Sequence, residues 1–172
     1  YSLSLTDGIV RGEPLILLNC DIYPEEAIFD KVVRGVRQGD SIVPYDPDEP
    51  DEDALQLELS SNHTPKNILD KGHPDGDGAT LGLFSLNREA SKALFSDIDE
   101  YLGREDARAF WFEHSISRLF DSLEFSPFNV SELEWFEIDT EEDLRHASIS
   151  LGQSKEAIDE YINQIITDVD NN

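Results

Sequence analysis

The sequence predicts an α/β domain with a parallel sheet that is flanked by helices and carries an inserted antiparallel hairpin. Two observations favour this class. A continuous apolar run, Leu15–Leu18, ends in the polar residues 19–21, and helical patterns alternate with further short apolar runs. Such a run is typical of a strand buried on both faces of a parallel sheet. A chain of 172 residues with 38% hydrophobic content is long enough to bury one core.

A helix and a second strand are expected directly after this run. Residues 24–34 begin with Pro24 and two acids, which suit the first turn of a helix, and Gly35 follows them. Residues 40–45 predict a second short strand. Residues 46–53 contain six acids, two prolines and no base, which indicates a solvated loop.

The middle of the chain predicts the hairpin. Leucines alternate with polar residues over 55–59, which is typical of a half-exposed strand, and residues 66–69 supply the returning strand. The Gly-rich residues 72–78 predict a loop. Residues 79–85 predict a further strand that is interrupted by Gly82.

The remaining elements follow from the same patterns. Thr140 and the acids after it form a capping-box signature that begins a helix ending near residue 150. The other expected elements are helices over 87–102, 106–123 and 154–167, and strands over 125–130 and 135–138.

The charge of the chain excludes several classes of function. Asp and Glu number 38 against 13 Lys and Arg, so the formal net charge is −25 and the pI is about 4.1. Nucleic-acid binding and attachment to an anionic membrane both need a basic surface. No segment approaches the roughly 20 apolar residues of a membrane span. We therefore expect neither nucleic acid nor membrane as a partner.

The spread of the acids resembles the acidic protein surfaces of salt-loving archaea, and we expect a halophilic, haloarchaeal source. The alternative is a single acidic patch for a basic partner, which the even spread fits less well. The first residues have no basic region of a secretory signal, and the single Cys20 excludes an internal disulfide framework. These features predict a cytoplasmic protein of unknown oligomeric state.

Asp21 and Asp139 form the most informative pair of polar residues. Each directly follows a predicted strand, and ligands of open α/β sheets collect beyond the carboxyl ends of strands. Two carboxylates at that edge are suited to share one Mg²⁺ ion. The alternative, that each Asp only caps or turns the chain, stays open on the pattern alone.

Two segments carry a resemblance to a known family. Leu15–Asp21 resembles the apolar strand and Gly-Asp segment of nucleotidyltransferases (MobA-like NTP transferases that activate sugar phosphates and phospho-alcohols). Glu134–Leu144 resembles their Trp-x-Glu-Ile-Asp-Thr-x-x-Asp-Leu segment, and the phosphocholine cytidylyltransferase-like group is the most similar branch. The order of the hairpin, the strand after Gly82 and the helix with Trp111 also fits. The resemblance spans about residues 1–151, with a C-terminal helix and a frayed tail over 152–172.

The resemblance implies a function and a set of site residues. It implies a Rossmann-like, mostly parallel sheet flanked by helices. It also implies a magnesium-dependent nucleotidyltransferase, most similar to cytidylyltransferases, that joins a nucleoside triphosphate to a phosphorylated sugar or small alcohol and releases pyrophosphate. Asp21 and Asp139 are the implied catalytic and metal-binding residues. The implied substrate-binding residues are Lys71, Gly82, Glu113 and Glu137. The alternatives, that Lys71 is an ordinary solvated lysine and Glu113 an ordinary acid of a helix, stay open.

Two departures from the family pattern leave an alternative open. The family begins with a glycine-rich Gly-x-Gly-x-Arg loop that holds the triphosphate, and this sequence contains no such motif. We therefore expect the chain to correspond to the C-terminal two-thirds of the domain. Cys20 also stands where the family usually has Gly. The alternative function is a non-catalytic, nucleotidyltransferase-like module with a binding or regulatory role.

Overall fold

The computed structural model describes residues 2–48, 54–102 and 111–152. The predicted helix over 154–167, the C-terminal tail and most of the predicted acidic loop lie outside these residues. The chain divides into two compact units: unit 1 contains residues 1–19 and 25–134, and unit 2 contains residues 20–24 and 135–172. Each unit is described by itself below.

The described residues of unit 1 form a seven-stranded sheet in the order β1-β7-β3-β6-β4-β5, with β8 paired to β3. Its helical segments are η1, α1, α2, α3 and α4. The bounds of the elements are η1 Leu3–Thr6, α1 Asp7–Val10, β1 Leu15–Leu18, α2 Glu26–Gln38, β3 Ile42–Asp46, β4 Gln56–Leu59, β5 Pro65–Leu69, β6 Gly78–Thr80, β7 Leu83–Leu86, α3 Arg88–Leu102, α4 Phe112–Leu119 and β8 Ser126–Asn129.

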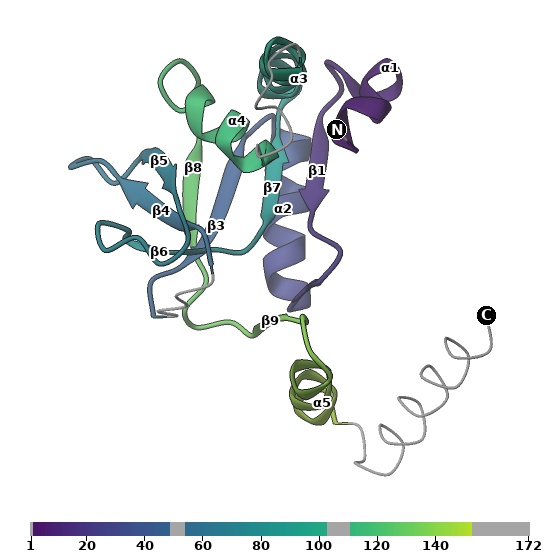
Figure 1. The fold of residues 1–172 in the computed structure, drawn as a ribbon, viewed down its shortest axis with the longest axis vertical. Coiled ribbons are helices and arrows are strands. Elements are labelled where there is room, and N and C mark those ends of the chain that lie inside the picture. The colour runs from purple at the N-terminus through teal and green to yellow at the C-terminus, as the bar shows by residue number, and fades with distance from the viewer. Residues whose placement is uncertain (1, 49–53, 103–110, 153–172) are drawn as a thin grey trace. The chain divides into compact units, whose positions relative to one another are not determined.

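The α/β class is confirmed, but the expectation of a mostly parallel sheet is wrong. Among the described strands of unit 1 only β3 and β8 pair in parallel, and the other pairs are antiparallel. The reason lies in β7, which stands between β1 and β3 and runs antiparallel to both (Figure 1). The chain does cross over from β1 through α2 to β3 in the same direction, but these two strands are not neighbours.

Strand β7 is buried on both faces, whereas β1 is not. All four residues of β7 are buried, whereas β1 is half-buried over Leu15–Leu17 and exposed at Leu18. Phe84 of β7 packs in a core cluster with residues of α3 and α4. Ser85 faces the other way, where its hydroxyl accepts a hydrogen bond from the N–H of Ile42 at 2.9 Å, and α2 packs against this side of β7 (Figure 1).

The helix α2 is longer than predicted. It continues through Gly35 because that glycine lies against Ile42, where an added Cβ would come within 2.2 Å of the Ile42 side chain. The helix ends at Gly39, whose φ of +89° is the left-handed conformation that glycine adopts at helix C-termini. In the structure Gly35 marks the close packing of α2 against Ile42, and Gly39 marks the end of the helix.

The hairpin and the later elements agree with the predictions. Strands β4 and β5 pair antiparallel, and β6 and β7 flank Gly82. Asn87 begins α3, because its side-chain oxygen accepts the N–H of Ala90 at 2.9 Å. The predicted helix over 106–123 is described from Phe112 to Leu119 as α4, and residues 103–110 lie outside the described part.

Unit 2 contains β2 (Ile22–Pro24), β9 (Trp135–Glu137) and α5 (Glu141–Ser150). The strands pair antiparallel, with Ile22 opposite Glu137 and Pro24 opposite Trp135. The predicted capping box is present at the start of α5. None of the described helices combines the length and the apolar character needed to cross a membrane.

Candidate metal centre

Three carboxylates of unit 2 meet at one point. Asp21, Glu137 and Asp139 each offer an oxygen, and these three oxygens lie within 4.8 Å of one another. Asp21 and Glu137 are half-buried, and Asp139 is exposed. The structure therefore brings the predicted pair Asp21 and Asp139 together and adds Glu137 to it.

The pairing of β2 with β9 explains why these residues meet. Ile22 stands opposite Glu137, so Asp21 lies beside the end of β9, and the N–H of Ile138 donates to the carbonyl oxygen of Asp21 at 2.8 Å. Side chains two apart on an extended chain point to the same side. Glu137 and Asp139 are two apart, so an extended chain turns both carboxylates to one side. Asp21 lies in the turn before β2, outside the regular ladder, and its carboxylate meets the other two there.

The capping box of α5 fixes the backbone at Asp139. The side chain of Asp143 accepts hydrogen bonds from the backbone N–H groups of Asp139 at 3.2 Å and Thr140 at 2.8 Å. The Thr140 hydroxyl also donates to this carboxylate at 2.8 Å. These bonds, of which the one from the hydroxyl is the strongest cause, hold the pKa of Asp143 below its ordinary value. The Asp143 carboxylate thereby ties the backbone after β9 to the first turn of α5.

We predict that Thr140→Ala loosens this start of α5. The substitution removes the hydroxyl that receives the N–H of Asp143 at 3.2 Å, and loss of such a cap costs about 1 kcal/mol. Hydrogen exchange of the α5 amides measures the effect, and exchange is expected to become faster. Thr140→Ser keeps the hydroxyl and serves as the control. Equal exchange in the two variants would show that the cap does not hold this helix.

The charges at the three carboxylates favour a bound cation. Like charges this close repel each other, and a divalent cation removes the repulsion. Asp21 Oδ1 is buried, and no group among the described residues donates a hydrogen bond to it. A buried carboxylate oxygen without a partner is costly. Mg²⁺ takes oxygen ligands and is commonly bound through few carboxylates, so these residues fit it.

The other predicted site residues lie in unit 1, in one group of three contacting residues and one contacting pair. Gly82 contacts Asn19, which in turn donates from Nδ2 to Oε1 of Glu113 at 3.4 Å. The Nζ atom of Lys71 lies 5.7 Å from the ring centroid of Trp111, the residue before α4. Glu113 belongs to the first turn of α4. Lys71, Gly82 and Glu113 thus all lie at or near contacts with the start of α4.

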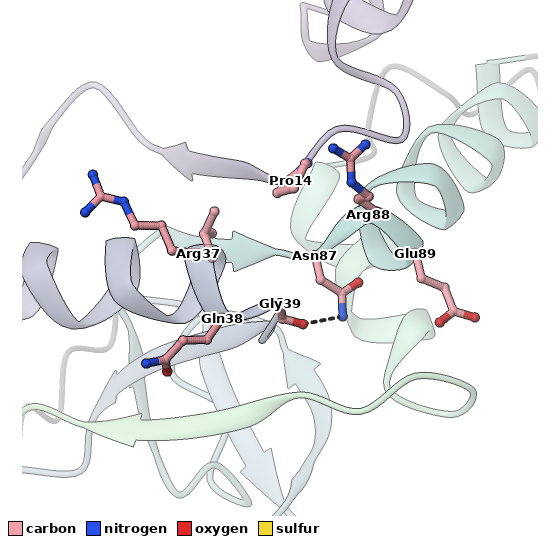
Figure 2. Close-up of a pocket in the computed structure, with 8 residues that line it drawn as sticks. Pro14, Arg37, Gln38, Gly39, Asn87, Arg88 and Glu89 are labelled. Carbon is pink, nitrogen blue, oxygen red and sulfur yellow. Dashed lines mark hydrogen bonds between the residues drawn. The ribbon is translucent and has the colours of Figure 1, made fainter.

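One open pocket of about 430 Å³ lies elsewhere in unit 1. Figure 2 shows the side chains of Arg37, Arg88 and Glu89 pointing in different directions around it. Asn87 Nδ2 donates across it to the carbonyl oxygen of Gly39 at 3.1 Å, and Arg88 pairs with Glu13 at 2.9 Å. None of the predicted site residues lines this pocket, so we do not assign it to the site. Its full lining is Pro14, Val36, Arg37, Gln38, Gly39, Asn87, Arg88 and Glu89.

The structure is similar to several solved structures of enzymes. A glucose-1-phosphate thymidylyltransferase of Bacillus anthracis, solved with sucrose, matches with a TM-score of 0.69 at 16% identity over 86% of this chain and 58% of its own. UDP-glucose pyrophosphorylase of Acinetobacter baumannii matches with a TM-score of 0.63 at 12% identity over 98% of this chain and 61% of its own. A UTP-bound UGPase of that species matches at 0.63 and 11% identity over 96% and 60%. The chain has the fold of a sugar-phosphate nucleotidyltransferase.

This chain spans about three-fifths of the length of these nucleotidyltransferases. No protein-family model matches the sequence, and no curated protein matches it. The similarity to these solved structures therefore concerns the fold. It agrees with the family resemblance of the two sequence segments.

The sequence pattern does not show the surroundings of Glu137 and does not single out Asn19. Glu137 was expected to bind substrate, and its position beside Asp21 becomes visible only with the register of β2 and β9. The sequence pattern assigns Asn19 only to a polar turn. Its one sequence signal is its place at the end of the apolar run, two residues before Asp21.

Proposed function

We propose that this protein is a divalent-metal-dependent nucleotidyltransferase that uses Mg²⁺. The observation that carries the proposal is the trio Asp21, Glu137 and Asp139, with its buried unpaired oxygen, in a fold shared with sugar-phosphate nucleotidyltransferases. The substrates are a nucleoside triphosphate and a phosphorylated small molecule. We assign no role to nucleic acid or to a membrane, since the chain carries a net charge of −25.

The proposed reaction is a transfer between two phosphates. An oxygen of the acceptor phosphate forms a bond to the α-phosphorus of the triphosphate, the bond from that phosphorus to the bridging oxygen breaks, and pyrophosphate leaves with the electron pair. Bound Mg²⁺ supplies charge neutralisation for the triphosphate. Asp21, Glu137 and Asp139 hold that ion. The remaining work of the protein is positioning, since phosphoryl transfer needs little covalent help from side chains.

The acceptor is assigned to residues of unit 1. We propose that the Lys71 ammonium contacts a substrate phosphate, and that the Glu113 carboxylate accepts a hydrogen bond from the acceptor. Gly82 supports this group indirectly, through its contact with Asn19. The acceptor class is a sugar phosphate or the phosphate of a small alcohol.

The proposed nucleotide is CTP. This choice rests on the resemblance of residues 134–144 to phosphocholine cytidylyltransferase-like enzymes. The structurally similar enzymes differ from one another in this respect, since one is a thymidylyltransferase and one was solved with UTP. We place the protein in the cytoplasm of a halophile, because acidic surfaces of this kind suit concentrated salt.

An assay of pyrophosphate release tests the proposed function. The polypeptide is assayed as its gene encodes it, in high salt with Mg²⁺, with each of CTP, UTP, dTTP, GTP and ATP against glucose 1-phosphate and phosphocholine. We expect acceptor-dependent release that is fastest with CTP and that Asp139→Asn lowers at least about 100-fold, with Glu142→Gln as the control on the exposed face of α5. Full activity of Asp139→Asn would remove the metal assignment.

A second candidate function is a non-catalytic nucleotidyltransferase-like module. This candidate predicts binding of a nucleotide or sugar phosphate without release of pyrophosphate. The same assay, run beside equilibrium binding of CTP, separates the two functions.

A further inference from the structure

Asn19 lies between two residues of unit 1 that are far apart in the sequence. It directly follows β1, and its backbone N–H donates to the carbonyl oxygen of Gly82 at 3.0 Å. Its side chain lies against the α-carbon of Gly82, where an added Cβ would come within 2.4 Å of Asn19 Nδ2. The same Nδ2 donates to Glu113 Oε1 at 3.4 Å. Because Gly82 has no side chain, the Asn19 amide can occupy the space beside it and donate to Glu113.

The carboxylate of Glu113 is buried, with 6% of the residue exposed. A carboxylate in such a place needs hydrogen bonds to the protein or to a ligand, and each bond also limits its rotation. The amide of Asn19 supplies one of these bonds from a side chain that is itself fixed at Gly82. A carboxylate has about four acceptor sites, so a carboxylate that is held by hydrogen bonds from the protein can accept one more from a ligand.

We propose that Asn19 is a positioning residue, which holds the Glu113 carboxylate in one orientation to accept a hydrogen bond from a hydroxyl group of the acceptor. The inference rests on the proposed function, because that function places Glu113 at the acceptor. Asn19 itself touches Glu113 and Gly82, and it acts on the acceptor through Glu113.

The residues around Glu113 favour an acceptor that presents a hydroxyl group over one that presents a quaternary ammonium. A quaternary ammonium has no N–H to donate and is bound by open aromatic faces. Trp111 is 46% exposed, but it stacks with His114 at a centroid distance of 5.9 Å and has the Lys71 ammonium 5.7 Å from its ring centroid. Phe112 packs edge-on against Phe84 of the core. A second cation at Trp111 would meet the charge of Lys71, whereas a hydroxyl would not.

A reciprocal exchange of the two side chains tests the proposal. The variants are Asn19→Asp, Glu113→Gln and the double variant that carries both. In the double variant the amide at position 113 donates to the carboxylate at position 19, so the hydrogen bond is kept with its direction reversed. Asn129→Asp is the control, because the side-chain oxygen at Asn129 already accepts the N–H of Ser131 at 2.9 Å and an aspartate accepts it equally.

Two readouts are needed: unfolding by denaturant, and equilibrium binding of glucose 1-phosphate as the probe in the presence of Mg²⁺. Asn19→Asp is expected to lower stability, because two carboxylates then face each other, and to weaken probe binding about tenfold or more. Glu113→Gln is expected to weaken probe binding to a similar degree. The double variant is expected to regain stability without regaining probe binding, since the acceptor still lacks its carboxylate.

Three results would overturn the proposal, and they differ from one another. Recovery of probe binding in the double variant would show a purely structural hydrogen bond. Additive stability effects of the two single variants would show that Asn19 and Glu113 do not interact. If the unaltered chain does not bind glucose 1-phosphate although the stability effects are coupled, the proposed acceptor function of Glu113 fails while the contact with Asn19 stands.

Discussion

Asp21→Asn and Asp139→Asn are each expected to weaken the binding of Mn²⁺, used as a spectroscopic substitute for Mg²⁺, at least about 100-fold. Loss of residues that only support metal ligands costs about 10–100-fold in affinity, and a direct ligand contributes at least as much. Electron paramagnetic resonance of free Mn²⁺ measures the affinity. Glu142→Gln, in the exposed first turn of α5, removes an equal charge outside the trio and is expected to leave the affinity unchanged.

The same variants are expected to change stability in opposite directions with and without the metal. In EDTA, Asp139→Asn should raise the free energy of unfolding, because one of three mutually repelling carboxylates becomes neutral. With Mn²⁺ in excess, the unaltered protein should be the more stable, because only its native state binds the ion tightly. A variant that is less stable than the unaltered protein in EDTA would contradict the repulsion that this account assigns to the trio.

Gly82→Ala is expected to destabilise unit 1 by about 2–5 kcal/mol. Gly82 has a φ of +63°, and a left-handed conformation costs an L-residue about 1–2 kcal/mol. The new Cβ would also come within 2.4 Å of Asn19 Nδ2, and overpacking of this kind costs about 1–3 kcal/mol more. Denaturant unfolding measures the change.

Gly12→Ala is the matched control for this substitution. Gly12 has a φ of +75°, but no atom lies within 4 Å of the position its Cβ would take, so only the cost of the backbone conformation of about 1–2 kcal/mol is expected. The excess loss at Gly82 therefore measures the contact with Asn19. Addition of Asn19→Ala to Gly82→Ala should recover part of that excess, and equal losses at the two glycines would contradict the contact.

Local patterns in the sequence predicted most elements because local forces determine them. The capping box at Thr140 and the cap at Asn87 need only residues three positions apart, and both are present. The pairing of strands is not local. The apolar run of β1 predicts a buried strand, and the strand is half-buried over Leu15–Leu17. No residue in that run shows that β7 pairs with β1 in the antiparallel direction.

The candidate site shows the same limit. The sequence pattern points to Asp21 and Asp139 because each follows a predicted strand, and polar residues after strands mark the edge where ligands bind. The place of Glu137 beside them depends on the register in which β9 pairs with β2, which neither strand determines alone. The contact of Asn19 with Glu113 joins residues 94 positions apart, and it depends on the packing of α4 against the end of β1.

Anomalous diffraction from crystals soaked in MnCl₂ tests the central claim, that Asp21, Glu137 and Asp139 together hold one divalent cation. The account predicts one peak among the three carboxylates, about 2.1–2.3 Å from an oxygen of each, and its loss in crystals of Asp139→Asn soaked in the same way. A strong peak elsewhere in the molecule with none at these carboxylates, or an unchanged peak in Asp139→Asn, would contradict the account.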